Sequence, residues 1–175
     1  MKQLRGTPLK RFLRAQPGPQ SPTELVVVCQ SVAYPVNVGS IFRLADALGV
    51  ADLVLSGITP TPPQPTIRKV GRGKDRWVPW RYVERPEEAL LELRAQGFWI
   101  AALEITDSCR PYYEVEYPAR VALVVGNEDH GVTRASLSLC DVAVFVPMYG
   151  RGKSLNVHVS LAVVGYHILH RCRQG

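Results

Sequence analysis

The sequence predicts an α/β domain with a mainly parallel β-sheet and helices on both faces of that sheet. Short runs of β-branched and other apolar residues alternate along the chain with segments of helical periodicity. These runs lack the alternating polar residues of a half-exposed strand, so both faces of the sheet are expected to be covered. A length of 175 residues with 46% hydrophobic content fits one soluble domain of ordinary size.

The chain begins with a basic N-terminal extension, residues 1–22, which precedes the predicted domain at 23–175. This extension contributes five of the six net positive charges and contains no acidic residue. We expect a short basic helix followed by a linker rich in proline and glycine. The extension lacks the apolar stretch of a secretory signal, and its low serine content makes it a poor match to an organelle transit peptide.

The first part of the domain predicts a strand, a helix and a second strand. Residues 24–30 form a continuous β-branched run, which is typical of a buried parallel strand. A helix is expected from about 37 to 48, because its apolar residues repeat on one face and Gly49 follows it. A short strand at 52–55 comes next, and the four prolines of residues 56–66 indicate turns.

The segment 68–76 is the second concentration of positive charge, with five basic residues and one acid. The Gly71-Arg72-Gly73 sequence within it favours a flexible basic loop. Two interpretations of the charge stay open at this point. The clusters are typical of proteins that bind a polyanion, and they equally fit a solubilising tail and a solvated loop.

The remaining strands and one helix follow in alternation. A short strand is expected near 80–83, and a helix at 86–96 begins with proline in its first turn. Apolar strands are then expected at 98–103, 121–125 and 142–146.

The chain ends in a long predicted helix, about 154–171, whose apolar residues are distributed around its whole circumference. A helix of this kind has to be buried on all sides. One face would otherwise meet water in a domain of this size, so we expect a homodimer that covers it.

The cysteines are widely spaced, and they are Cys29, Cys109, Cys140 and Cys172. No CxxC or Cys/His spacing predicts a zinc site. Cys29 and Cys140 lie in or beside apolar runs and are expected in the core. We infer a reducing compartment and a cytoplasmic protein.

Three polar segments, 34–43, 126–131 and 147–156, each follow a predicted strand. In an open α/β sheet, ligands bind at the carboxyl ends of strands, so these segments are expected to form one site. The Gly152-Lys153-Ser154 sequence is similar to the end of a phosphate-binding P-loop. That motif requires glycine where this chain has Pro147, so a nucleoside triphosphatase is the weaker alternative.

The three segments together carry a resemblance to one family. Residues 37–43 (NVGSIFR) resemble the first SpoU motif, N-x-G-x-x-x-R, and residues 126–131 (GNEDHG) resemble the second, G-x-E-x-x-G. Residues 147–156 (PMYGRGKSLN) resemble the third, P-M-x-G-x-x-x-S-L-N. The chain is thereby similar, from about residue 24 to its end, to SpoU (TrmH-like) RNA ribose 2′-O-methyltransferases of the SPOUT superfamily.

The resemblance implies a deep trefoil knot near the C-terminus and dimerisation through the knot region. It implies S-adenosylmethionine as methyl donor, no metal, and structured RNA as substrate, with tRNA favoured over rRNA because no separate RNA-binding domain precedes the catalytic part. The implied donor-binding residues are Leu103, Gly126, Val146, Met148 and Leu155. A non-catalytic RNA-binding protein on the same fold is the alternative.

The resemblance also implies catalytic roles for Arg43, Asn37, Glu128, Ser154 and Asn156. A guanidinium stays protonated, so Arg43 is expected to grip a phosphate and stabilise a developing alkoxide rather than act as a base. Glu128 is expected to hold Arg43 or Asn37. Each residue also has a structural interpretation: Arg43 as one half of a surface ion pair, and the other four as helix caps or capping acids.

The positive clusters are the implied RNA contacts, and the residues are Lys10, Arg11, Arg14, Arg68, Lys69, Arg72 and Lys74. His158 departs from the family pattern, which has a small residue at that position. We expect it to be a hydrogen-bonded core or interface residue rather than a catalytic base.

Overall fold

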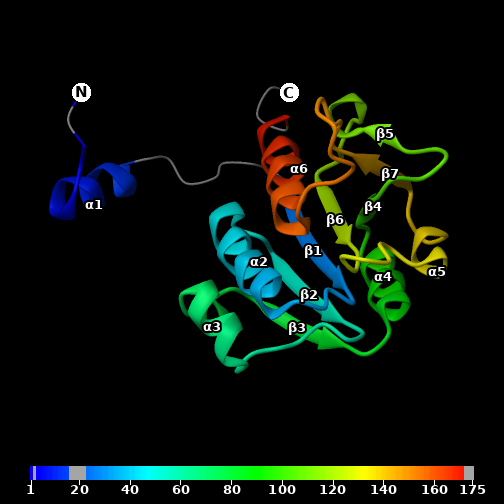
Figure 1. Ribbon diagram of the computed structural model, residues 1–175, viewed down its shortest axis with the longest axis horizontal. Helices are drawn as coiled ribbons and strands as arrows, with labels where there is room; N and C mark the ends of the chain where they lie inside the picture. The colour runs from blue at the N-terminus through cyan, green and yellow to red at the C-terminus, as the bar shows by residue number, and fades with distance from the viewer. Residues whose placement is uncertain (2, 16–22, 172–175) are drawn as a thin grey trace.

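The chain folds around one seven-stranded sheet with helices on both sides (Figure 1). The structure is a computed structural model, and it describes residues 1, 3–15 and 23–171, without the side chain of residue 171. None of the described helices is long and apolar enough to span a membrane.

All strand pairs of the sheet are parallel, and the strand order is β3-β2-β1-β6-β4-β7-β5. The strands are β1 (Glu24–Gln30), β2 (Asp52–Ser56), β3 (Trp80–Val83), β4 (Trp99–Leu103), β5 (Arg110–Pro111), β6 (Arg120–Val125) and β7 (Val142–Phe145). The predicted parallel sheet is confirmed. The central strand β6 lies between β1 and β4, and β4 lies between β6 and β7.

Two hydrophobic cores cover the two faces of the sheet, and alternate residues of each central strand belong to different cores. The helices are α2 (Pro35–Leu48), α3 (Pro65–Gly71), α4 (Pro86–Ala95), α5 (Arg134–Leu137) and α6 (Val157–Arg171). In β1, Val27 packs into the core under α2, α3 and α6, whereas Val28 packs into the core under α4 and α5. The prediction of helices on both faces is thus confirmed.

Cys29 lies in the first core and is fully buried, as expected. Burial, together with the nearby charge of Glu128, raises the pKa of the Cys29 thiol far above its usual value. The thiol is therefore a core group and not a nucleophile.

Helix α2 has the start and stop that its sequence indicates. Pro35 occupies its first turn, where a missing N–H costs nothing. Gly49 ends it in the left-handed conformation, at φ 62°, and its N–H bonds to carbonyls of the last turn. The inward face of α2, which includes Ile41 and Phe42, is completely buried.

The prediction of a flexible loop at 68–76 is wrong. Residues 65–71 form α3, and Lys74–Arg76 form a 3-10 turn, η1. Gln64 caps α3 by accepting a hydrogen bond from the N–H of Ile67 at 2.9 Å, and Ile67 is buried beneath α2. One buried apolar anchor and a side-chain cap therefore order a segment whose composition is that of a loop.

Besides α3 and η1, three more short elements were not predicted: β5, the 3-10 turn η2 (Tyr112–Glu114) and α5. Helix α6 begins at Val157, three residues later than expected, so that 154–156 belong to the preceding loop.

The expected short basic helix is present as α1 (Gly6–Ala15), and none of its residues is buried. Figure 1 shows it apart from the sheet. The predicted linker lies largely at residues 16–22, outside the described residues.

Helix α6 is apolar on both its inner and outer sides, as predicted. Leu161, Val164 and Ile168 are fully buried against the sheet and α2. On the other side, Val159 is 39% exposed and Tyr166 is 53% exposed. The outer stripe of α6 therefore has no cover within the described chain.

Candidate functional site

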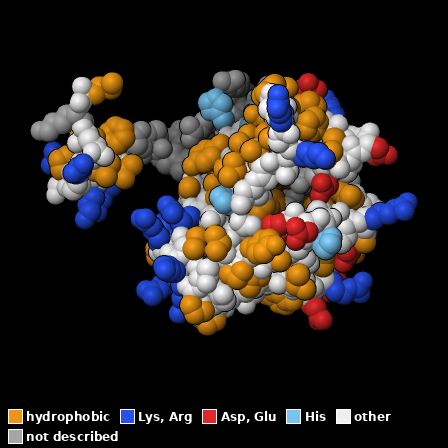
Figure 2. All heavy atoms as spheres, viewed as in Figure 1, with side chains coloured by type: hydrophobic (Ala, Val, Ile, Leu, Met, Phe, Trp, Pro, Cys, Tyr) orange, Lys and Arg blue, Asp and Glu red, His pale blue; other side chains and the backbone are white. Residues whose placement is uncertain are grey.

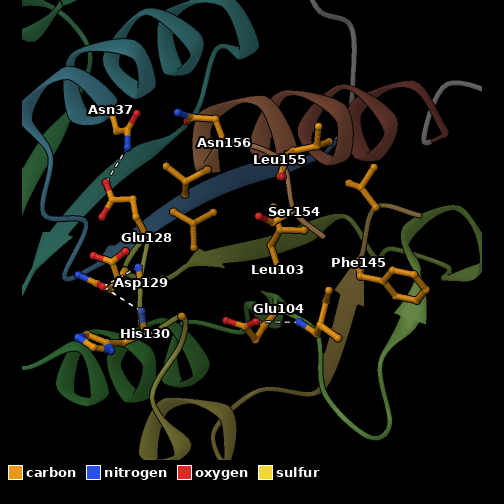
Figure 3. Close-up of a pocket in the computed structure, with 18 of the residues that line it drawn as sticks. Asn37, Leu103, Glu104, Glu128, Asp129, His130, Phe145, Ser154, Leu155 and Asn156 are labelled. Atoms are coloured by element: carbon orange, nitrogen blue, oxygen red, sulfur yellow. Dashed lines mark hydrogen bonds between the residues drawn. The ribbon is translucent and has the colours of Figure 1, made fainter. Parts of the chain in front are cut away.

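A cavity of about 650 Å³ opens at the carboxyl ends of β4, β6 and β7, beside the segment that follows β1 (Figure 3). Its volume is within the range of sites that bind drug-sized ligands. The three polar segments of the sequence all contribute to its wall. The edge of the sheet where they meet is the one where α/β proteins bind ligands.

Nine of the ten residues expected to bind the donor or to act in catalysis line this cavity. They are Asn37, Leu103, Gly126, Glu128, Val146, Met148, Ser154, Leu155 and Asn156. The tenth, Arg43, does not line it.

The loop after β6 folds back tightly on itself. Asn127 and Gly131 exchange two backbone hydrogen bonds, of 3.1 and 2.8 Å, which close the loop at its base. A side chain at Gly126 would overlap the backbone of Gly131 and Val132, so only glycine fits there. The Asn127 side chain accepts from the N–H groups of Asp129 and His130.

Glu128 is held by the start of α2. Its Oε2 accepts from the N–H of Ala33 at 2.8 Å, and its Oε1 accepts from the N–H of Tyr34 at 3.3 Å. The side-chain amide of Asn37 donates to the same Oε1 at 2.7 Å. Glu128 thus caps α2 and not the helix that follows it in the chain. Of the two partners expected for Glu128, it binds Asn37 and not Arg43.

Asn37 is not the helix cap that its type suggests. Tyr34 occupies the cap position, and Asn37 lies in the first turn, with 6% of its surface exposed. Its amide is turned towards Glu128 and the cavity (Figure 3).

Glu104, which sequence reasoning missed, fixes the opposite side of the same loop. It follows the last residue of β4, and its two carboxylate oxygens accept from the N–H groups of Ile105 and Val132, each at 2.8 Å. The signal in the sequence was a polar residue directly after an apolar strand, the same signal that identified the other loops. Glu104 lines the cavity together with Glu128 and Asp129, and Lys153 is the one lysine or arginine among the described residues that line it.

The segment before α6 supplies Ser154, Leu155 and Asn156 to the cavity. Asn156 caps α6, since its Oδ1 accepts from the N–H of His158 at 3.2 Å. Lys153 and Ser154 precede α6 and take no part in its first turn. The backbone here therefore gives no support to a P-loop.

Arg43 is exposed on the outer side of α2 and makes no hydrogen bond or ion pair with any described residue. Asp46, the nearby acid on the same face, binds two other residues. Lys74 Nζ lies 2.6 Å from its Oδ2, and the indole N–H of Trp77 donates to its Oδ1 at 2.7 Å. The surface ion pair expected as the structural alternative is absent among the described residues. The Arg43 guanidinium faces solvent.

The expected RNA contacts differ in their surroundings. Lys10, Arg11 and Arg14 are exposed on α1. Arg68 is bound to Asp75 at 3.2 Å, and Lys74 to Asp46. Two more, Lys69 and Arg72, are exposed and form no ion pair with described residues.

His158 lies in the first turn of α6, partly buried, and its Nδ1 is buried without a hydrogen-bond partner among the described residues. Burial lowers the pKa of its imidazole. The hydrogen bond that we expected for this side chain is therefore not formed at Nδ1 within the described chain.

The cavity wall combines apolar and acidic surfaces. Leu103, Val125, Val146 and Leu155 offer an apolar wall for a flat ring, and the carboxylates described above stand beside it. Such a site suits a ligand with an aromatic part and positive charge. Among the described residues, no group of three or more His, Cys, Asp or Glu side chains is placed to hold a metal ion.

Comparison with known proteins gives one consistent result. The family model described as the SpoU rRNA Methylase family matches residues 24–166. The chain is 35% identical over 141 residues to the tRNA (guanosine(18)-2'-O)-methyltransferase of Thermus thermophilus, an alignment that covers 81% of this chain and 72% of that protein.

Two solved structures share the fold. The A. aeolicus TrmH/SpoU tRNA modifying enzyme superposes with a TM-score of 0.77 at 28% identity, covering 95% of this chain and 85% of that one. The SpoU methyltransferase AviRb from Streptomyces viridochromogenes, solved in complex with AdoMet, gives a TM-score of 0.78 at 25% identity. The match covers 89% of this chain and 63% of AviRb, so the chain spans less than two thirds of that protein.

Proposed function

The chain belongs to the SpoU family of S-adenosylmethionine-dependent RNA ribose 2′-O-methyltransferases, and we propose that it methylates a ribose 2′-hydroxyl of structured RNA. The observation that carries this proposal is the cavity at the strand ends, where all three motif segments meet in one wall. The deep trefoil knot is the property of the fold that family membership implies.

The lining of the cavity fits the methyl donor. The apolar wall around Leu103, Val146 and Leu155 suits an adenine ring, and Met148 is placed beside it. Glu104, Glu128 and Asp129 suit a ligand that carries both a sulfonium and an ammonium group. When bound, S-adenosylmethionine supplies an activated methyl group on a good leaving group. AviRb, a relative at 25% identity, was solved with this donor.

The residues of the chain supply placement and charge. We propose that Asn37 and Glu128 hold in place the side of the cavity that receives the ribose, because their hydrogen bond joins two of the motif segments. Ser154 and Asn156 line the site from the loop that precedes α6.

Arg43 is assigned to the RNA phosphate next to the target ribose. Its guanidinium has no acidic partner among the described residues, so a bidentate grip on a phosphate is open to it. From there it stabilises negative charge that develops on the 2′-oxygen as the proton leaves to the phosphate or to water. It stays protonated throughout and takes no proton itself.

A homodimer is the proposed assembly. The outer stripe of α6, with Val159, Val163 and Tyr166 at helical spacing, lacks cover within the described chain. Helix α2 packs beside α6. In the dimer that we propose, contact through α6 brings Arg43 of one subunit towards the cavity of the other subunit. Arg43 can then contact the RNA phosphate at that cavity, although it does not line the cavity of its own chain.

We propose tRNA over rRNA as the substrate, in line with the Thermus thermophilus relative, whose name assigns it to guanosine 18 of tRNA. We propose that RNA phosphates are held by the extension at residues 1–22, through Lys10, Arg11 and Arg14 of α1. Lys69 and Arg72, which form no ion pair with described residues, are proposed to hold phosphates as well. The cytoplasm is the proposed compartment, consistent with free thiols at Cys29, Cys109 and Cys140.

The test is methyl transfer from tritium-labelled S-adenosylmethionine to an unmodified tRNA transcript. We expect label on one ribose, detected as a phosphodiester that resists alkaline cleavage. A transcript with 2′-deoxyribose at the mapped position is the control and should stay unlabelled. RNA binding without any labelling, under conditions where the donor binds, would favour the non-catalytic RNA-binding alternative.

A further inference from the structure

Trp77 is the one exposed tryptophan of the three in this chain. It is 57% exposed, whereas Trp80 and Trp99 are partly buried against the first core. An exposed indole offers a flat aromatic face on which another ring can stack. The surroundings of this ring indicate what that partner is.

The ring of Trp77 is held in place from two sides. Its N–H donates to Asp46 Oδ1 at 2.7 Å, and Lys74 Nζ lies 4.7 Å from the ring centroid. Lys74 also binds the other oxygen of Asp46, at 2.6 Å. Although partial burial raises the pKa of Asp46, the hydrogen bonds from Lys74 and Trp77 outweigh it, and the pKa lies below its usual value. The carboxylate stays charged and the indole stays oriented.

The segment that leads to this ring, residues 68–76, is rich in cations. Lys69, Arg72 and Arg76 are exposed around α3 and η1 and form no ion pair with described residues. The acids of the region, Asp46 and Asp75, are neutralised by Lys74 and Arg68. Figure 2 shows Lys and Arg side chains gathered over α2 and α3, at the left edge of the body. An exposed aromatic face on a segment rich in exposed cations fits a polyanion that also carries flat rings.

The ring lies on the same side of α2 as Arg43. Arg43 and Asp46 are three residues apart on this helix, so their side chains are neighbours on one face. Trp77 is bound to Asp46. A nucleotide on the ring is therefore next to the phosphate that Arg43 is proposed to hold.

We propose that Trp77 is a stacking platform for an unpaired base of the RNA substrate, set by Asp46 and Lys74 and flanked by phosphate contacts from Lys69, Arg72 and Arg76. The inference rests on the proposed function, because it takes the substrate to be RNA with bases turned out of a helix. It also changes the part played by Arg68 and Lys74. They hold the acids Asp75 and Asp46 and position the platform, instead of binding phosphates directly.

The test compares RNA binding by the whole chain and its variants. The probes are an unmodified tRNA transcript and a single-stranded hexa-adenylate. Both should quench the tryptophan fluorescence of the wild type. Trp77→Ala should abolish most of the quench and weaken transcript binding about 5- to 150-fold, the range for loss of one stacked base. Trp77→Phe, which keeps an aromatic face, should retain most of the affinity.

Salt dependence separates stacking from charge. Trp77→Ala should leave the slope of log affinity against log salt unchanged, whereas Arg72→Ala should reduce it by about one. Tyr82→Ala is the matched control, since Tyr82 is an exposed aromatic on β3 whose hydroxyl donates to the carbonyl of Gly57. It should bind RNA like the wild type, and all variants should bind S-adenosylmethionine equally.

Transcript affinity within twofold of the wild type for Trp77→Ala would overturn the platform, as would an equal loss in Tyr82→Ala. Methyl transfer by the wild type is measured on the same transcript. If RNA quenches Trp77 without any methyl transfer, the proposed function fails and the platform stands. If transfer occurs and Trp77→Ala binds normally, only the platform fails.

Discussion

Asn37 donates its side-chain amide to Oε1 of Glu128 across 2.7 Å, joining the first turn of α2 to the loop after β6. The two residues are 91 positions apart in the chain and belong to different sequence motifs. The same carboxylate also accepts from the backbone N–H groups of Ala33 and Tyr34. Glu128 is therefore the junction between two walls of the cavity, and the first prediction concerns its charge.

Replacing Glu128 by glutamine should weaken this junction. Glutamine has one acceptor oxygen where the carboxylate has two, so at least one of the three donors loses its partner. We expect the free energy of unfolding, measured in urea, to fall by about 1–3 kcal/mol and methyl transfer to fall roughly 10- to 100-fold. Glu116→Gln, at an exposed carboxylate without a partner among the described residues, should change neither quantity. Equal stability and activity in both variants would contradict the assignment.

A methyl group at position 126 should distort the loop after β6 and so weaken binding of the methyl donor. Gly126→Ala places its new carbon inside the backbone of the folded-back loop at Gly131 and Val132, which cannot move as a side chain can. We expect S-adenosylmethionine binding, measured by calorimetry, to weaken at least 10-fold, on the order of the cost of overpacking. Gly165→Ala is the control, because its methyl meets only the movable side chain of Leu48. Equal donor affinity in Gly126→Ala and the wild type would show that the loop geometry is not required.

His158 should make the folded chain sensitive to mild acid. Burial lowers its pKa below the unfolded value, so the unfolded chain binds the proton more readily. Stability should therefore fall as the pH drops from about 7.5 through 6.5 and below, towards the lower folded pKa. The loss should be smaller in His158→Gln, and His130→Gln, at an exposed position, should follow the wild type. The free energy of unfolding in urea, measured at a series of pH values, gives this loss of stability. Parallel pH curves for the wild type, His158→Gln and His130→Gln would refute the prediction.

A charge on the outer stripe of α6 should separate the proposed dimer. Val159→Asp and Tyr166→Asp introduce carboxylates on the side of α6 that lacks cover within the described chain. We expect sedimentation equilibrium to give about twice the chain mass for the wild type and the mass of one chain for the double variant. Leu91→Asp, at an exposed leucine of α4 on the opposite face of the sheet, should stay dimeric. A monomeric wild type would contradict the dimer.

Much of the fold follows from local patterns in the sequence. The β-branched runs at β1 and β6 are strands because they are buried on both faces, and such runs leave little choice of structure. Helix α3 was missed because its order depends on Ile67 reaching the core beneath α2, a contact between distant parts of the chain. Its composition of proline and basic residues is that of a loop.

In the candidate site too, local patterns predict some features, whereas others depend on contacts between distant residues. The three motif segments could be grouped from the sequence, since each follows an apolar strand and parallel strands end at one edge. The partner of Glu128 could not be fixed, because Arg43 and Asn37 lie on one helix and only its rotation decides which of them faces the cavity. Glu104 was missed since its role is to accept backbone N–H groups, one of them 28 residues away.

The proposed role of Arg43 in methyl transfer depends on its position in the dimer. Its side chain lies outside the cavity of its own chain and has no partner among the described residues, yet we assign it to the reacting ribose and phosphate. The most direct test is single-turnover methyl transfer to the tRNA transcript by Arg43→Ala, alongside donor binding. We predict a loss of about 100- to 1,000-fold in transfer with unchanged donor affinity, and no loss in Arg134→Ala, an exposed arginine on α5. Transfer at the wild-type rate by Arg43→Ala would contradict the role of Arg43 at the reacting ribose.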